Sequence, residues 1–133
     1  MVRMEINTEE QYQIIDITYD IEAEVAESDI KEGLCIVTIP HVSAGLIFAE
    51  DEEGIKLDYL SLLDQLVPPP SEQYHHNLID TNAEAQLKAI LLGSNQIIPI
   101  IDGKLSRGRW QKILFIELDG PRERTVNVMI IKK

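Results

Sequence analysis

The sequence predicts a single α+β domain in which a mostly antiparallel sheet wraps over helices. Short apolar segments and helix-like segments follow one another in the order strands, helix, strands, two helices, three strands, which is typical of this class. The chain has 133 residues, the length of one ordinary domain, and 44% of them are hydrophobic, which is enough to form a core. We therefore expect one domain covering residues 1–133.

Seven segments have the short, apolar character of strands. The run LCIVTI is typical of a central strand, whereas TVNVMII alternates between two faces. An Asp102-Gly103 turn and a DGPRER turn separate the last three strands. The expected strands cover residues 4–7, 12–17, 34–39, 44–48, 96–101, 112–118 and 125–131.

Three segments have helical spacing. Asp20 would cap a short helix over 21–28, with Ile21 and Val25 on one face and Gly33 ending the turn that follows. A second helix over 55–66 should stop at the three prolines 68–70.

The third predicted helix covers residues 83–92. Asn82 is a favourable N-cap and Gly93 a favourable C-terminal stop. The apolar side chains Leu87, Ile90 and Leu91 recur at helical spacing, so we expect them to form the buried stripe.

The charges are unevenly distributed along the chain. The net charge is −11, which disfavours binding to nucleic acid and to anionic membranes. Residues 1–100 carry four basic side chains against nineteen acidic ones, whereas residues 101–133 carry eight against four. The basic segment could be a set of solvated loops, an anion site or a subunit interface. The last strands are apolar on both faces, so association of copies is also expected.

The sequence indicates a cytoplasmic protein. Cys35 is the only cysteine, which excludes a disulfide within the chain and fits a reducing compartment. The first residues contain no apolar stretch typical of a signal peptide, and no segment has the roughly 20 apolar residues of a membrane span.

The histidines are the first candidates for chemistry. Tight zinc sites need at least three protein ligands, and adjacent residues of an extended chain point apart, so His75 and His76 should not bind one ion together. The simplest alternative is that each histidine is a hydrogen-bonded loop residue. The carboxylates that could act as ligands or as a base are Glu50, Asp51, Asp80 and Glu84.

The arginines of the C-terminal third are candidates for phosphate binding, because guanidinium groups bind phosphate in bidentate fashion. They are Arg107, Arg109, Arg122 and Arg124. Trp110, the only tryptophan, is expected to be a core or interface anchor. The sequence contains no phosphate-binding loop, dinucleotide fingerprint, CxxC pair or nucleophile elbow.

An ordered set of short motifs resembles the YjbQ-like family, the so-called secondary thiamine-phosphate synthases. The motifs are HVSAGLIFAE, YHHN, NAEAQLKAILLGS, IPIIDGKL, GRWQ and ELDGPRER. The resemblance implies a single α+β domain with a mixed sheet curled around a helix, assembled as a homotrimer. It also implies a histidine cluster near a subunit boundary that holds a metal or an anion.

The resemblance assigns roles to particular residues. His41 and His76 would bind metal or phosphate, Glu50 would orient a group or act as a base, and Arg122 would be an anion partner. Further binding residues would be Ser43, Asn77 and Gln86.

Two positions depart from the family pattern. Gln86 replaces the histidine of the helix motif, and Arg109 replaces the threonine of the G-T-W-Q motif. An amide is a poor zinc ligand, so we expect tight zinc binding to be weakened or lost. Gln86 could still hydrogen-bond a water, a phosphate or a weakly held Mg²⁺, while Arg109 could offset lost metal charge if it lies near the site.

Three functions remain open. The resemblance implies that a hydroxymethylpyrimidine diphosphate is joined to a thiazole phosphate with loss of pyrophosphate, so the expected partner is a small phosphorylated molecule. The alternatives are a non-catalytic trimer with a decayed metal site, and a metal-assisted hydrolase. The hydrolase would suffer most from the missing histidine, because it needs an activated water.

Overall fold

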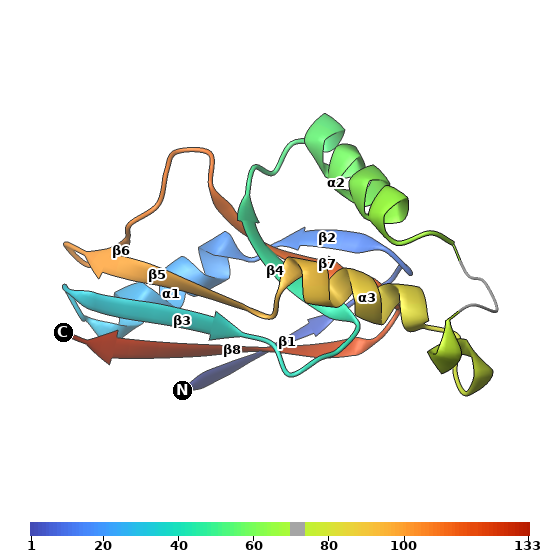
Figure 1. Ribbon diagram of the computed structural model, residues 1–133. Helices are drawn as coiled ribbons and strands as arrows, with labels where there is room; N and C mark the ends of the chain where they lie inside the picture. Colours follow the sequence, from blue (N-terminus) through green and yellow to red (C-terminus); the bar gives the residue numbers. More distant parts are fainter. Residues whose placement is uncertain (70–73) are drawn as a thin grey trace.

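The computed structural model describes residues 1–69 and 74–133, which form two sheets and three α-helices (Figure 1). One sheet has the strand order β1-β8-β3-β5-β6 and the other has the order β2-β7-β4. All six strand pairings in the described residues are antiparallel. The α+β class is therefore confirmed, and the described strands form antiparallel rather than mixed sheets.

The strands largely match the expected segments, with one short addition at β6. The five-stranded sheet consists of β1 (Val2–Asn7), β8 (Glu123–Lys132), β3 (Gly33–Thr38), β5 (Asn95–Ile101) and β6 (Lys104–Leu105). The three-stranded sheet consists of β2 (Gln13–Asp16), β7 (Lys112–Glu117) and β4 (Ala44–Ala49). The prediction that β3 is central is confirmed, because it pairs with β5 and β8.

The first helix, α1 (Thr18–Ser28), packs against strands of both sheets, and the sheets curl around it. Ile21 and Val25 are buried on one face, as expected. The predicted Asp20 cap was wrong, because the helix starts earlier and the Asp16 Oδ1 atom accepts hydrogen bonds from the N–H and Oγ1 of Thr18 at 2.9 and 2.6 Å.

The end of α1 also differs from the prediction. Asp29 ends the helix with a left-handed φ of 56°, and Gly33 instead begins β3. A Cβ atom on Gly33 would lie 2.0 Å from the carbonyl oxygen of Ile131, so this glycine allows β3 and β8 to approach each other closely.

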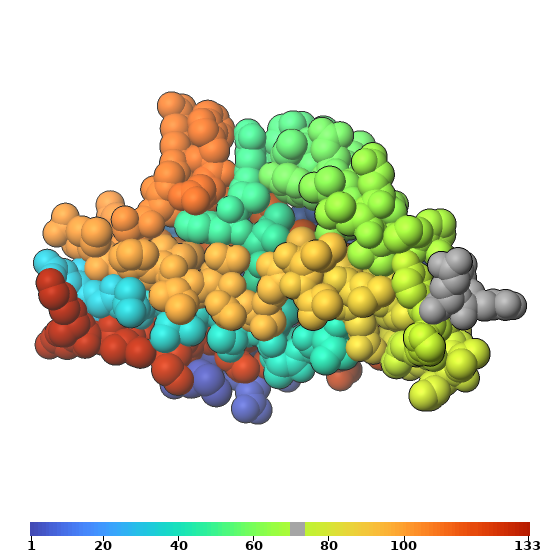
Figure 2. Space-filling view, in the orientation of Figure 1, coloured from blue at the N-terminus to red at the C-terminus, as the bar shows by residue number. Residues whose placement is uncertain are grey.

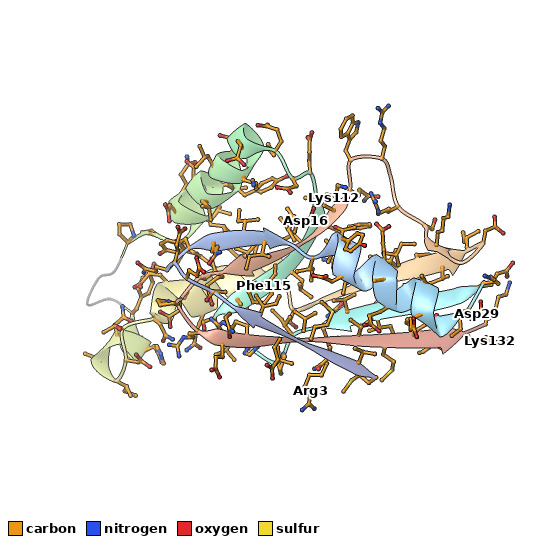
Figure 3. The ribbon with its side chains drawn as sticks, turned by 180° about the vertical axis from the view of Figure 1, so that it is seen from behind. Arg3, Asp16, Asp29, Lys112, Phe115 and Lys132 are labelled. Atoms are coloured by element: carbon orange, nitrogen blue, oxygen red, sulfur yellow. The ribbon has the colours of Figure 1, made fainter. Side chains whose placement is uncertain are left out.

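The main core lies between the two sheets and α1. β7 runs through its centre, and Phe115 on this strand is fully buried (Figure 3). A smaller core on the other side of the three-stranded sheet contains Leu63 of α2 (Glu53–Leu66) and Ala85 and Ala89 of α3 (Ala83–Leu92). The three-stranded sheet is thus covered on both faces, which explains why β7 is apolar almost throughout.

The predicted buried stripe of α3 was wrong. Leu87, Ile90 and Leu91 are 36%, 76% and 56% exposed, whereas the alanines of the helix face the sheet. Small side chains let the helix approach β4 closely: a Cβ atom on Gly45 would lie 2.7 Å from the Cβ of Leu92. The helix therefore buries its alanine face, because only small side chains allow this close approach, although its leucine and isoleucine face is more hydrophobic.

The second helix ends at Leu66, as expected, and Val67 separates it from the prolines; Pro70 lies outside the described residues. Of its apolar side chains Leu63 is buried, while Leu62 and Leu66 are more than half exposed. In the described residues, no helix combines the length and apolar character needed to cross a membrane.

Candidate functional site

A pocket of about 300 Å³ lies beside His76. It is formed by the short 3-10 helix η1 (His75–Leu78) and the first turns of α3. The lining residues are Tyr74, His75, His76, Ala83, Gln86 and Leu87. A larger hollow of about 500 Å³ lies elsewhere, over apolar residues of β3, β5 and β8, and contains none of the predicted site residues.

Hydrogen bonds around Asn82 define the proton positions at this pocket. The Nδ2 atom of Asn82 donates to Asp119 Oδ2 at 3.0 Å, so the Asn82 Oδ1 atom is the acceptor that this side chain offers to its other neighbours. That oxygen lies 2.7 Å from His76 Nε2 and accepts from Gln86 Nε2 at 3.3 Å. A carbonyl oxygen has two lone pairs, so both nitrogens can donate to it.

This arrangement fixes the form of His76. Its Nε2 atom carries the proton that is donated to Asn82, which leaves Nδ1 as the ring atom available to a ligand. The 3.2 Å contact between Gln86 Nε2 and His76 Nε2 then joins two donors and is not itself a hydrogen bond.

The N-terminus of α3 is capped differently from the prediction. Among the described residues Asn82 makes no side-chain capping bond, because its amide is used by His76, Gln86 and Asp119. The Oδ1 atom of Asn77 instead accepts from the Ala83 N–H at 3.1 Å. Its Nδ2 atom donates to Glu84 Oε1 at 2.8 Å, so Asn77 holds η1 against α3.

Arg122 joins the same network through Asp119. Its Nη2 atom lies 2.8 Å from Asp119 Oδ2, and its Nε atom donates to the Asp119 carbonyl oxygen at 2.8 Å. The side chain of Arg122 is 51% exposed, so part of its guanidinium group faces solvent. Asp119 raises the pKa of Arg122 through this hydrogen bond. His76, Gln86 and Arg122 are therefore linked by two shared partners, Asn82 and Asp119.

Ser43 belongs to a second, buried network around Glu117. The Oγ and carbonyl oxygen of Ser43 accept from Arg124 Nη2 at 2.9 and 3.1 Å. Arg124 also forms an ion pair with Glu117, and the Thr8 hydroxyl donates to Glu117 at 2.7 Å. The N–H of Asp119 donates to Glu117 Oε2 at 3.1 Å, so the buried network supports the turn that carries the pocket's carboxylate.

His41 lies beside the buried network, not beside the pocket. Its Nε2 atom accepts from the Thr125 N–H at 2.8 Å. Burial and then the nearby charge of Arg124 lower the pKa of His41, which favours the neutral ring. In the described part of the chain, His41 and His76 share no hydrogen-bond partner.

Glu50 is exposed and lies at the opposite end of β4 from Ser43. Its carbonyl oxygen accepts from the Tyr59 hydroxyl at 3.0 Å. Within one chain, Glu50 is therefore separated from the other predicted site residues by the length of a strand.

The donors present do not fit a tight zinc site within one chain. Among the described residues, no three His, Cys, Asp or Glu side chains converge in a way that could hold a metal ion. The Nε2 atom of His76 and the Oδ2 atom of Asp119 are both used by protein hydrogen bonds. A tight zinc site would also need more anionic or imidazole ligands than this pocket offers.

Sequence reasoning missed Asn82 and Asp119 as site residues. The local pattern indicates only a helix cap at Asn82 and a DGPR turn at Asp119, and the tertiary fold shows that the two side chains bond to each other. No local sequence pattern indicates that Glu117 and Arg124 form a buried pair, because in the sequence they look like ordinary surface charges.

Comparison with known proteins gives a consistent picture. A family profile described as UPF0047 protein YjbQ-like matches residues 2–133. A UPF0047 protein of Archaeoglobus fulgidus is 42% identical over 96% of this chain and 98% of its own length. The UPF0047 protein YugU of Bacillus subtilis is 33% identical, with 96% of each chain covered.

Solved structures agree with these sequence matches. A YbjQ-like protein of unknown function from Sulfolobus solfataricus has a TM-score of 0.95 at 39% identity, covering 99% of this chain and 96% of that one. A hypothetical protein from Aeropyrum pernix has a TM-score of 0.93 at 36% identity, covering 99% and 98%. The chain therefore belongs to the UPF0047 YjbQ-like protein family.

Proposed function

We propose that the pocket beside His76 binds a small phosphorylated molecule that carries a flat ring. We further propose that the reaction is the one implied by the family resemblance, in which a pyrimidine diphosphate and a thiazole phosphate are joined with loss of pyrophosphate. The observation that carries the proposal is that His76 and Gln86 both line this pocket and are held together by the Asn82 side chain.

The size and lining of the pocket suit a small heterocycle. A volume of about 300 Å³ is at the lower end of the range for small-molecule sites. Tyr74, His75 and Leu87 provide ring and aliphatic surfaces, and the Gln86 amide provides polar atoms that could hydrogen-bond a ring nitrogen or amino group. Apolar walls with a few placed polar groups are the usual composition of such sites.

The proposed reaction needs little acid–base chemistry. The thiazole nitrogen attacks the methylene carbon of the pyrimidine, a C–N bond forms, the C–O bond to the diphosphate breaks, and pyrophosphate leaves with the electron pair. Catalysis then consists of holding the two rings together and stabilising charge on the leaving group. His76 would stabilise this charge through an N–H at Nδ1, which requires the doubly protonated ring because Asn82 holds the proton on Nε2. Arg122 would contribute the exposed part of its guanidinium group.

The carboxylates near the pocket favour a ligand whose phosphate charge is partly neutralised by a cation. Asp119 is paired with Arg122, Glu84 with Asn77, and Asp80 is exposed, so the surroundings carry more negative than positive charge. A diphosphate is therefore expected to bind together with Mg²⁺, which usually reaches proteins through one or two carboxylates and the phosphates of the substrate. The magnesium ion would arrive bound to the diphosphate, so the protein does not need to supply a complete set of ligands for it.

We also propose that the chain acts as a homotrimer, as the resemblance implies. The outer face of the five-stranded sheet supports association because it is apolar and exposed. Its outward-facing side chains include Leu34, Ile97, Ile101, Met129 and Ile131. A monomer rarely leaves such a face uncovered.

The binding proposal is tested by calorimetric titration with magnesium pyrophosphate and with thiazole phosphate. Replacing His76→Ala or Arg122→Ala should weaken pyrophosphate binding about 10- to 100-fold, the usual effect of losing a hydrogen bond to a charged group. Lys31→Ala, which removes an exposed cation from the far turn before β3, is the control and should bind normally.

Turnover separates the three candidate functions. Pyrophosphate release that requires both substrates supports the synthase. Release of phosphate from pyrophosphate alone supports a metal-assisted hydrolase. If neither ligand binds to the wild-type chain, the proposal fails and a non-catalytic trimer is the better description.

A further inference from the structure

The direction of the hydrogen bonds at the pocket beside His76 is set by residues outside the pocket. The chain of bonds begins at Arg122, whose Nη2 atom donates to Asp119 Oδ2 at 2.8 Å. A guanidinium group can only donate hydrogen bonds, and an ionised carboxylate can only accept them. The Asp119 Oδ2 atom therefore also accepts from Asn82, whose Nδ2 atom lies 3.0 Å away. Neither Asp119 nor Arg122 is among the residues that line the pocket.

The Asn82 amide passes this direction on to the pocket. Because its Nδ2 atom donates to Asp119, its Oδ1 atom is left to accept. The Gln86 amide atom that lies 3.3 Å from this oxygen must then be the Nε2 donor. His76 Nε2, at 2.7 Å, is the second donor to the same oxygen. The orientation of the Gln86 amide thus follows from the donors and acceptors around it.

Gln86 therefore presents its oxygen to a ligand. The side chain is half-buried, lines the pocket and directs its Nε2 atom towards Asn82 and His76. The Oε1 atom lies on the other side of the same amide carbon, and no described residue donates a hydrogen bond to it. An amide oxygen has two lone pairs, so Oε1 can accept one or two hydrogen bonds from a bound molecule.

The other walls of the pocket favour a flat ring beside this oxygen. Tyr74 and His75 contribute ring surfaces, and Leu87 contributes an aliphatic one. The elements that carry these residues, η1 and the first turns of α3, lie side by side at one end of the molecule and form part of its surface (Figure 2). A ring that packs on these surfaces turns its polar edge to the Gln86 amide, which is the usual division of roles in small-molecule sites.

Ring substituents differ in the hydrogen bonds that they offer. An amino group on a pyrimidine donates through its N–H bonds, whereas a methoxy group and an unprotonated ring nitrogen only accept. An acceptor placed against Gln86 Oε1 would leave both atoms desolvated and unpaired, which is unfavourable. The pocket can therefore distinguish two ligands that differ in a single substituent.

We propose that Gln86 is a specificity-determining residue that selects ring ligands carrying an exocyclic amino group. Asn82 and Asp119 are the positioning residues that fix its amide. The ring and the phosphate of this ligand are those of the proposed function, on which the inference rests. The family motif has a histidine at position 86, so this selectivity is a property of the present chain.

A matched pair of pyrimidinylmethyl phosphates tests the selection. One compound carries an amino group next to the methylene arm, and the other carries a methoxy group in its place. Calorimetric titration of the wild-type chain should show about 10- to 100-fold tighter binding of the amino compound, the usual effect of leaving a buried acceptor unpaired. Gln86→Met, which has a similar length but no amide oxygen, should bring the two affinities close to each other.

Asp119→Asn tests the chain of hydrogen bonds, because this position lies outside the pocket lining. Asparagine can donate to Asn82 Oδ1, so Asn82 and then Gln86 can turn over and present the Gln86 nitrogen to the ligand. The ratio of the two affinities should fall, although loss of the ion pair with Arg122 weakens the binding of both phosphates. Asp58→Asn, which removes an exposed carboxylate from α2, is the control for charge and should leave the ratio unchanged.

The ratio separates selection from a general effect on stability or charge. Equal affinity of the wild-type chain for both compounds would overturn the proposal, as would a preference that survives in Gln86→Met. A purely structural role of Asp119 would weaken the binding of both compounds by the same factor. An unchanged ratio in Asp119→Asn would therefore overturn its positioning role.

The same compounds distinguish this selectivity from the proposed function. Selection of the amino compound without pyrophosphate release from the two substrates would leave the selectivity standing and refute the synthase. Turnover without selection would refute only the role of Gln86. If neither compound binds, both proposals fail.

Discussion

The substitution Glu117→Gln should destabilise the fold strongly, because it removes one charge of a buried ion pair. Glu117 is fully buried, and its carboxylate accepts from the Thr8 hydroxyl at 2.7 Å, from two nitrogens of Arg124, and from the Leu118 and Asp119 N–H groups at 3.0 and 3.1 Å. Glutamine has nearly the same volume but no charge. The guanidinium of Arg124, only 4% exposed, would remain buried without its counter-charge.

Removing one partner of a buried ion pair costs about 3–5 kcal/mol. A domain of this size has a free energy of unfolding of about 5–15 kcal/mol, so the variant should lose a large part of its stability. Urea unfolding followed by circular dichroism measures the loss. Glu123→Gln, an exposed position on β8, is the matched control and should change the free energy by less than about 0.5 kcal/mol.

The pH dependence provides a second check. Burial alone would raise the pKa of Glu117, but hydrogen bonds from Arg124, Thr8 and the Asp119 N–H outweigh it and lower the pKa below the ordinary 4.5. The wild-type chain therefore keeps this stabilisation above pH 4.5 and loses it as the pH falls through the lowered pKa, whereas Glu117→Gln lacks this loss. A variant as stable as the control would refute the role assigned to the buried pair.

Three further outcomes follow from the structure. The lowered pKa of His41 means that stability falls as the pH drops below 6.5, and His41→Gln, which keeps an acceptor for Thr125, should flatten this dependence in thermal unfolding at pH 5–7. Gln86→His places a second imidazole at the position where the Gln86 Nε2 atom lies 3.2 Å from His76 Nε2, and it should raise zinc occupancy in elemental analysis; unchanged occupancy would count against a shared site. Gly45→Ala should cost about 1–3 kcal/mol in urea unfolding, because its Cβ would overlap Leu92, and a neutral effect would show that α3 can shift.

Much of the secondary structure followed from local patterns. The β3 run, the alternation of β8 and the alanine-rich α3 each carry enough apolar periodicity to mark an element. Errors arose where two local signals competed. Asp16 and Asp20 are both able to cap α1, and only packing of the helix against both sheets places its start at Thr18.

The buried face of α3 shows a different limit of prediction from the sequence. Its large side chains Leu87, Ile90 and Leu91 predict a buried stripe by hydrophobicity, yet they are exposed and the alanines are buried. The helix meets β4 at Gly45, where only small side chains fit. The identity of the neighbouring surface decides which face is buried, and that surface belongs to a segment far away in the sequence.

The sequence alone determined the α+β class and the element order, because both depend on residue type and nearby spacing. The motifs that resemble the YjbQ-like family added the candidates His76, Asn77, Gln86 and Arg122. Only the tertiary structure decided that Asn82 and Asp119 link these candidates, and that His41, Ser43 and Glu50 lie apart from them. Hydrogen bonds between segments depend on how strands and helices pack, and a linear pattern contains no record of the distances that packing creates.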